Sequence, residues 1–163
     1  MASWRDVETS APEFAEAVRA LFDAYRHKTL ATLRKDGSPR ISGIEAEFVE
    51  GDLRLGAMWH SVKALDLRRD PRFALHSGTG DADPATWKGD AKIAGRAEEI
   101  TDPAHIAAVQ AGDAGEAPPG PSHLFRADIT EVVLTRVGDP PDHLVLVIEV
   151  WREGQGLQRL ERR

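Results

Sequence analysis

The chain of 163 residues contains no cysteine, which excludes disulfide bonds, thiolate chemistry and cysteine-ligated metal sites. It also lacks any apolar run near the roughly 20 residues that a bilayer-crossing helix needs. Its opening residues, MASWRDVETS, have no apolar core of the kind found in signal peptides. These absences lead us to expect a cytoplasmic protein that does not bind membranes.

Positive charge is in the minority. Lysine and arginine total 21, against 27 aspartates and glutamates, which gives a net charge of -6. Proteins that bind nucleic acids usually carry a basic excess, so we do not expect a nucleic-acid partner. The six histidines show no HExxH or other ligand spacing, and we expect no metal site. The sequence also has no P-loop and no nucleophile elbow, and no catalytic acid or base is assigned.

The composition that is present fits one domain with a hydrophobic core, because 41% of the residues are hydrophobic and 29% are charged. Ser10 and Glu13 match a capping box, and apolar residues recur at helical spacing after them. We therefore predict an amphipathic N-terminal helix over about 11–27. The last residues, 153–163, are expected to form a C-terminal tail.

Strand-like runs fill much of the region between them, about 29–152. Turn signals such as Asp36-Gly37 separate successive runs and predict hairpins. The predicted strands are 29–34, 40–50, 53–58, 72–77, about 91–100, about 124–137 and about 144–152. This pattern of hairpin-linked strands with a few helices predicts a mainly β protein, built as a closed or nearly closed antiparallel barrel.

Two shorter helices are predicted between the strands. The first covers 61–70, with Ser61 as its N-cap, and the second follows Asp102 and Pro103 and ends near Gly112. Residues 112–121 are rich in glycine and proline and have little to bury, so we expect this segment to be mobile.

Lys63 occupies an unusual position, because it falls in the first turn of the predicted helix 61–70. The helix dipole disfavours a cation there by about 0.3–1 kcal/mol. The hydroxyl of Ser61, the free amides of the first turn and the Lys63 ammonium together have the composition of an anion or phosphate site. The alternative is that Lys63 is solvated and tolerated, since the penalty is small.

The wider sequence resembles the FMN-binding split barrel of the pyridoxamine 5'-phosphate oxidase-like superfamily. The resemblance is carried by A-T-L-R-x-D-G-S-P-R, then L-G-A, then S-x-K-x-x-x-L-x-x-D-P-R-x-A-L. In this chain those letters are residues 31–34, 36–40, 55–57, Ser61, Lys63, Leu67, 70–72 and 74–75. The detailed match covers about 29–77, and the later strands follow in the same order.

The resemblance implies an oxidoreductase that forms a homodimer, binds FMN at the subunit interface and acts on a small organic substrate. It implies that Ser61, Lys63 and Arg40 hold the cofactor phosphate. The cofactor-binding residues that it implies are Ala31, Thr32, Leu33, Arg40, Ser42, Gly56, Ala57, Met58, Trp59, Ser61 and Lys63. Alternatives are a strand bulge at Gly56 and a core or dimer-interface role for Trp59.

Some residues depart from the pyridoxamine phosphate oxidases themselves. Glu45 stands where the resemblance implies a lysine, and the C-terminal WREGQGLQRLERR has no arginine–histidine substrate motif. We therefore do not expect synthesis of pyridoxal phosphate. The segment 86–99 resembles relatives that use the deazaflavin coenzyme F420, whose polyglutamate tail would suit a basic groove. Arg68, Arg69 and Arg72 are candidates for such a groove, and the alternative is that they form the solvated end of the helix. A non-catalytic flavin or haem binder is a further alternative.

Overall fold

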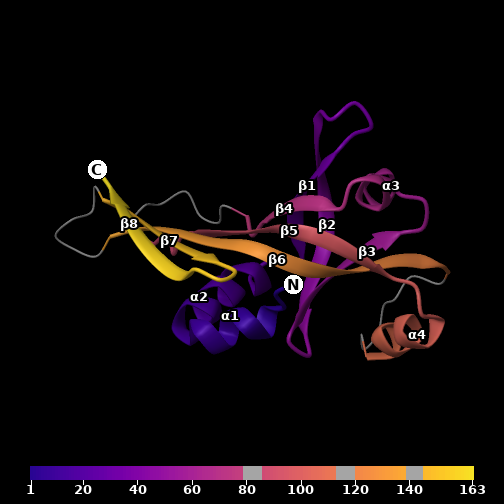
Figure 1. The fold of residues 1–163 in the computed structure, drawn as a ribbon, viewed down its shortest axis with the longest axis horizontal. Coiled ribbons are helices and arrows are strands. Elements are labelled where there is room, and N and C mark those ends of the chain that lie inside the picture. Colours follow the sequence, from indigo (N-terminus) through magenta and orange to yellow (C-terminus); the bar gives the residue numbers. More distant parts are fainter. Residues whose placement is uncertain (79–85, 113–119, 139–144) are drawn as a thin grey trace.

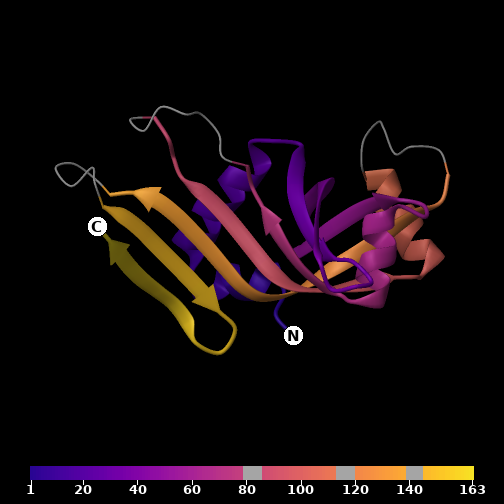
Figure 2. The ribbon, with the colours of Figure 1, turned by 90° about the horizontal axis from the view of Figure 1, so that it is seen from above.

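The computed structural model describes residues 1–78, 86–112, 120–138 and 145–163, and these contain one eight-stranded antiparallel sheet (Figures 1 and 2). The order of the strands across the sheet is β3-β2-β1-β4-β5-β6-β7-β8. Their bounds are β1 His27–Leu33, β2 Pro39–Val49, β3 Asp52–Met58, β4 Arg72–His76, β5 Asp90–Ile100, β6 Ser122–Val137, β7 Leu146–Arg152 and β8 Gly156–Arg162.

An additional pairing between β3 and β6 closes six of these strands into a barrel, which confirms the predicted mainly β architecture. Leu55 lies opposite Phe125 in this closing pair, and both side chains are buried. The strand β6 is 16 residues long. Its first half therefore closes the barrel, and its second half runs outward and pairs with β7, as Figure 2 shows.

The C-terminal segment is not the tail that the sequence predicts. Residues Gly156–Arg162 form β8, which pairs with β7 along its whole length. Nearly every residue of β8 is exposed, so its sequence lacks the buried alternate positions by which a strand is recognised. The tight turn before it uses Gly154 and Gly156, both at positive φ.

The N-terminal helix also differs from the prediction. Two helices are present, α1 (Trp4–Ser10) and α2 (Pro12–Asp23), with Ala11 between them. Ser10 ends α1 and does not cap α2, and the capping box is formed by Ser3 and Asp6 instead. The helix α2 packs on the outward half of the sheet, whereas α1 packs against β2 and β3. Where the two helices meet, Trp151 of β7 donates a hydrogen bond from Nε1 to the Ser10 hydroxyl at 2.7 Å.

The other two helices agree closely with the prediction. The helix α3 (Val62–Arg69) follows Ser61 at the N-cap position, and α4 (Pro103–Gly112) begins after Asp102. The Asp102 carboxylate accepts hydrogen bonds from the first-turn backbone amides of α4. Most of 112–121, the segment expected to be mobile, lies outside the described residues. No helix in the described ranges is long and apolar enough to cross a membrane.

The alternation of β1 and β2 determines which side chains meet α3. Leu30 and Ile44 point into the barrel and are almost fully buried. Thr32 and Arg40 form a cross-strand pair further along the same face, near the hairpin turn at Gly37. The inner face of β1 and β2 is thus polar at this end of the barrel.

Candidate cofactor site

The start of α3 lacks the side-chain cap that its sequence predicts. Ser61 occupies the N-cap position with extended φ and ψ, but its hydroxyl makes no capping hydrogen bond. Its Oγ is buried and, among the described residues, has no hydrogen-bond partner. An unpaired buried hydroxyl costs about 1–3 kcal/mol. The first-turn amides also point away from the helix without intrahelical partners, so both kinds of donor are available to an acceptor.

Lys63 extends toward the neighbouring strand and not directly into solvent. Its Nζ donates a short hydrogen bond to the backbone carbonyl of Gly43 on β2. The side chain is half-buried. The ammonium is therefore held between the first turn of α3 and the backbone of β2 at Gly43, although its location at a helix N-terminus is electrostatically unfavourable.

Asp66, one turn further along α3, is the polar centre of this end of the barrel. Asp66 is 2% exposed. Its Oδ2 accepts hydrogen bonds from Thr32 Oγ1 at 2.9 Å and from Arg40 Nε at 2.7 Å. Its Oδ1 accepts from Arg69 Nη2 at 2.7 Å. Asp66 is not among the site residues that the sequence predicts, because its burial follows from where α3 packs and not from any local pattern.

The charge balance around Asp66 favours an anionic ligand. Burial alone raises the pKa of this carboxyl, but hydrogen bonds from Arg69, Arg40 and Thr32 outweigh it and lower the pKa below 3.8. Asp66 is therefore ionised at neutral pH. Two guanidinium groups, Arg40 and Arg69, share the Asp66 carboxylate, so this cluster of three residues is positively charged despite the net charge of -6 for the whole chain.

The outer surface of β2 and β3 offers a smooth open area beside Lys63. Gly43 and Gly56 both lie there, and a Cβ added at either would meet nothing within 4 Å. Neither has positive φ, and the register through Gly56 is regular, so no strand bulge is present there. Nothing within the described chain requires glycine at these positions. Glycine in a strand often marks the close approach of a ligand or another backbone.

An aromatic pair lies at the end of β3. Trp59 stacks on His123 with ring centroids 4.6 Å apart and planes 11° from parallel. His123 is 2% exposed, and its Nδ1 lies 2.8 Å from a Glu99 carboxylate oxygen. Its Nε2 accepts a hydrogen bond from the backbone N–H of His60, which has a φ of 57°. This network requires the neutral Nδ1–H tautomer of His123. It fixes the segment that leads into Ser61, a role that the sequence analysis did not assign.

The basic groove expected from Arg68, Arg69 and Arg72 is neutralised by neighbouring carboxylates. Arg68 lies 3.0 Å from Glu99, and Arg72 lies 2.6 Å from Asp70. Arg69 binds Asp66 and the backbone carbonyl of Leu33. These guanidinium groups therefore face separate acidic partners and do not form one cationic surface.

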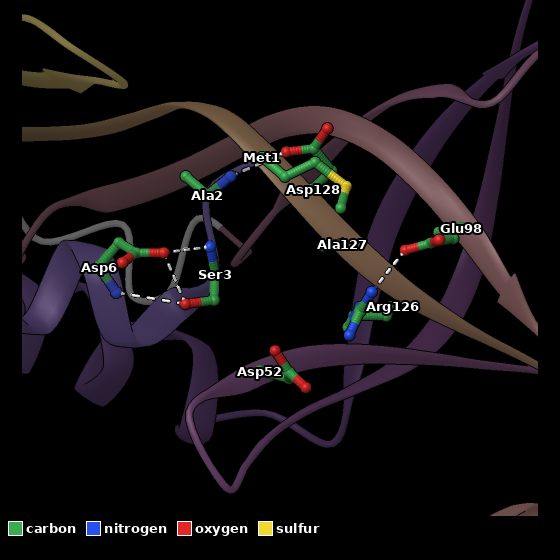
Figure 3. A pocket seen from close by; sticks show the side chains of 9 residues that line it. All are labelled: Met1, Ala2, Ser3, Asp6, Asp52, Glu98, Arg126, Ala127 and Asp128. Atoms are coloured by element: carbon green, nitrogen blue, oxygen red, sulfur yellow. Dashed lines mark hydrogen bonds and ion pairs between the residues drawn. The ribbon is translucent and has the colours of Figure 1, made fainter.

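Two cavities lie away from the predicted site. One, of about 260 Å³, is drawn in Figure 3 and lies between the N-terminus and β6. Its charged lining is mostly acidic, and its guanidinium group, Arg126, binds Glu98 at 2.6 Å. This is the opposite of what a phosphate needs. The other, of about 500 Å³, lies between α2 and the outward half of the sheet and is largely apolar.

The predicted cofactor residues fall on two faces of the same sheet. Alternation places some of them on the outer surface, namely Ala31, Leu33, Gly56 and Met58. Others share the inner face or its polar end, namely Thr32, Arg40, Ser42 and Ala57. Trp59, Ser61 and Lys63 follow β3 at the border between the faces. A ring lying on the outer surface meets Thr32 and Ala57 only through backbone atoms.

The closed barrel with its outward hairpin defines a protein of the split-barrel class. The family model described as pyridoxamine 5'-phosphate oxidase matches residues 14–136, and the chain belongs to this family. The match includes β1 to β5, α3 and nearly all of β6. No curated protein matches the sequence.

Several solved structures share the fold. A pyridoxamine 5'-phosphate oxidase-related, FMN binding protein from Nostoc punctiforme PCC 73102 is 16% identical with a TM-score of 0.65, covering 100% of this chain and 98% of that one. PhzG from Burkholderia lata 383, in complex with tetrahydrophenazine-1-carboxylic acid, is 15% identical with a TM-score of 0.59, covering 100% and 97%. A protein described as an F420 reductase is 19% identical with a TM-score of 0.52, covering 70% and 94%.

Proposed function

We propose that this protein is a cytoplasmic, homodimeric flavin-dependent oxidoreductase that binds FMN at the subunit interface and acts on a small organic substrate. Membership of the family supports this proposal. The main observation behind it is the start of α3. There the Ser61 hydroxyl, which has no partner among the described residues, and the Lys63 ammonium lie next to a glycine-bordered strand surface.

The residues present fit a phosphorylated cofactor. An acceptor at the helix start would satisfy Ser61 Oγ, which is buried without a partner in the described chain. It would also satisfy the first-turn amides and offset the dipole penalty at Lys63. Arg40 and Arg69 add positive charge behind them. When bound, the cofactor supplies the redox chemistry, and the chain contributes binding, orientation and exclusion of water.

The open surface over β2 and β3 fits the ring system. Gly43 and Gly56 leave room for a flat aromatic group against the backbone. Trp59, which follows β3, is 49% exposed. One chain supplies only one side of such a site. A second copy would cover the other side.

The test measures the affinity of wild type and of Lys63→Ala for FMN, with quenching of flavin fluorescence as the signal of binding. We expect Lys63→Ala to weaken FMN binding by about 10- to 100-fold, because it removes a charge-assisted contact to phosphate. Lys92→Ala, which removes an exposed lysine on β5, should bind like wild type. Equal FMN affinity in wild type and Lys63→Ala would show that the phosphate lies elsewhere.

The second candidate is an F420-dependent reductase. Glu45 favours it, because this carboxylate sits on the outer surface opposite Gly56, where the resemblance implies a lysine in FMN-binding pyridoxamine phosphate oxidases. Titration of the wild type with FMN and with F420 separates the two cofactors by affinity. Failure of the bound cofactor to cycle between reduced and oxidised forms would instead indicate a non-catalytic flavin binder, and tight haem binding would indicate a haem binder.

A further inference from the structure

Only one of the three guanidinium nitrogens of Arg40 is hydrogen-bonded within the described residues. Its Nε donates to Asp66 Oδ2 at 2.7 Å, while its terminal nitrogens Nη1 and Nη2 have no hydrogen-bond partner within the described part of the chain. Its side chain is 27% exposed, against 3% for Asp66. We propose that Asp66 is a positioning residue that holds the Arg40 guanidinium ready to bind the cofactor phosphate. This inference rests on the proposed function and names how its phosphate site is built.

The orientation of Asp66 is itself fixed by more than Arg40. Thr32, the cross-strand neighbour of Arg40, donates to the same oxygen, and Arg69 donates to the other. Arg69 also binds the carbonyl of Leu33 at 2.7 Å, so α3 is tied to β1 independently. The carboxylate therefore has one orientation, determined by two strands and a helix, and Arg40 meets a preformed acceptor.

A guanidinium held in this way retains its binding capacity. The Nη1 and Nη2 nitrogens form the outer edge of a planar fork that matches two oxygens of a phosphate. Fixing a long side chain before the ligand arrives reduces the entropy lost on binding. Lysine cannot take this role, because it has one nitrogen and cannot donate to Asp66 and offer a two-pronged face to phosphate at the same time.

Asp66 would oppose binding if its negative charge were directed at the phosphate. Three donors from Thr32, Arg40 and Arg69 cover both of its oxygens, and the residue is 2% exposed. Its charge is therefore compensated within the protein. Neutralising the carboxylate separates a positioning role from a repulsive one. Phosphate affinity should fall if Asp66 positions Arg40, and it should rise if Asp66 repels the ligand.

The experiment compares FMN with riboflavin, which has the same ring but no phosphate. Affinities for both are measured for wild type, Asp66→Asn, Arg40→Ala and the double variant. We expect Asp66→Asn to lose about 10-fold in FMN affinity with riboflavin affinity nearly unchanged. The double variant should bind FMN no more weakly than Arg40→Ala alone, because both changes remove one interaction.

Ser77→Ala is the matched control. Ser77 is 1% exposed and its hydroxyl accepts a hydrogen bond from the backbone N–H of Ala91, so its loss should lower thermal stability and preserve the ratio of FMN to riboflavin affinity. A structural role alone would lower stability in both variants and leave this ratio unchanged in Asp66→Asn. That result, additive losses in the double variant, or tighter FMN binding by Asp66→Asn would overturn the inference.

Arg40→Lys keeps the test decisive if Asp66→Asn does not fold. It retains the charge of a partly exposed residue but removes the Nε donor. We expect it to lose FMN preference as fully as Arg40→Ala, and wild-type preference in Arg40→Lys would refute positioning. A wild type that binds FMN no better than riboflavin refutes the proposed phosphate site itself. If wild type prefers F420, the same comparison uses F420 and its phosphate-free deazaflavin chromophore.

Discussion

At the scale of single residues, Asp66 couples the candidate site to stability. It is a carboxylate in the interior that remains charged because Thr32, Arg40 and Arg69 all donate to it. Removing one partner of a buried ion pair usually costs more than the pair contributes, since the remaining charge is left without compensation. The same contacts that fix α3 on the barrel therefore make this end of the molecule sensitive to acid.

We predict that acid destabilises the protein partly through Asp66. The folded-state pKa of this carboxyl lies below 3.8, so its contribution is full above the unfolded-state value and is lost as the pH falls through the folded-state value. In Asp66→Asn, stability at neutral pH should fall by about 2 kcal/mol, and its decline below about pH 4 should be shallower. Urea unfolding midpoints between about pH 6 and pH 2 measure both effects.

Asp36→Asn provides the comparison for this prediction. The pKa of Asp36 is also lowered, by hydrogen bonds from Ser38, but the residue lies in the exposed turn between β1 and β2. Solvent screens charges there, so Asp36→Asn should change the acid decline less than Asp66→Asn. An acid decline in Asp66→Asn as steep as that of wild type would contradict the assignment.

At the scale of elements, α1 closes the core next to the β2–β3 turn. Trp4 and Val7 are fully buried, and the Trp4 ring lies 4.4 Å from the ring of Phe48 on β2. The backbone N–H of Arg5 donates to the carbonyl of Gly51 in that turn at 2.8 Å. This short helix is thus part of the core and not an appendage, although it has only seven residues.

We predict that Trp4→Ala destabilises the fold by about 3–5 kcal/mol, the cost typical of deleting a large buried aromatic side chain. Tyr25→Ala is the control, because Tyr25 is 49% exposed and its deletion should cost far less. Chemical denaturation of both variants measures the difference. Similar losses in the two variants would mean that α1 does not contribute to the core as its burial indicates.

The elements that the sequence predicts well are those whose pattern is local. The strands β1 to β4 and the helix α3 show alternation, turn residues and a cap position within a few residues of each other. The helix α1 and the strand β8 were missed for the opposite reason. The helix α1 has seven residues, which is too short for a helical repeat of apolar residues to be recognised. The strand β8 is an edge strand exposed on both faces, so apolar and polar residues do not alternate along it.

The candidate site was predictable only in part. Lys63 is a cation in the first turn of a predicted helix, and this unusual position can be recognised from the sequence alone. Asp66 and His123 become visible only when α3 and β6 are placed against other strands, because each is buried through long-range contacts. The family resemblance indicates which residues bind the cofactor. Which face of the sheet each of them occupies depends on the register between neighbouring strands.

At the scale of the whole molecule, exposed apolar side chains gather around the candidate site. The outer surface of β2, the end of β3 and the solvent side of α3 carry Ile41, Met58, Trp59, Val62 and Leu65, which are 40–75% exposed. Contiguous exposed apolar surface commonly marks an interface. A second group lies on the outward hairpin, where Leu146, Leu157 and Leu160 are 42–49% exposed. The proposed shared cofactor site favours the first group as the centre of the dimer.

We therefore predict that Ile41→Glu converts the proposed homodimer to monomers and abolishes FMN binding together with dimerisation. Ile41 is 75% exposed, so the substitution should leave the stability of the single chain nearly unchanged, while a charge buried without a partner in an interface costs several kcal/mol. Sedimentation and FMN titration of the same samples measure both effects. Leu160→Glu places the same charge on the hairpin. Dissociation by Leu160→Glu but not by Ile41→Glu would locate the interface on β7 and β8 and separate it from the cofactor site.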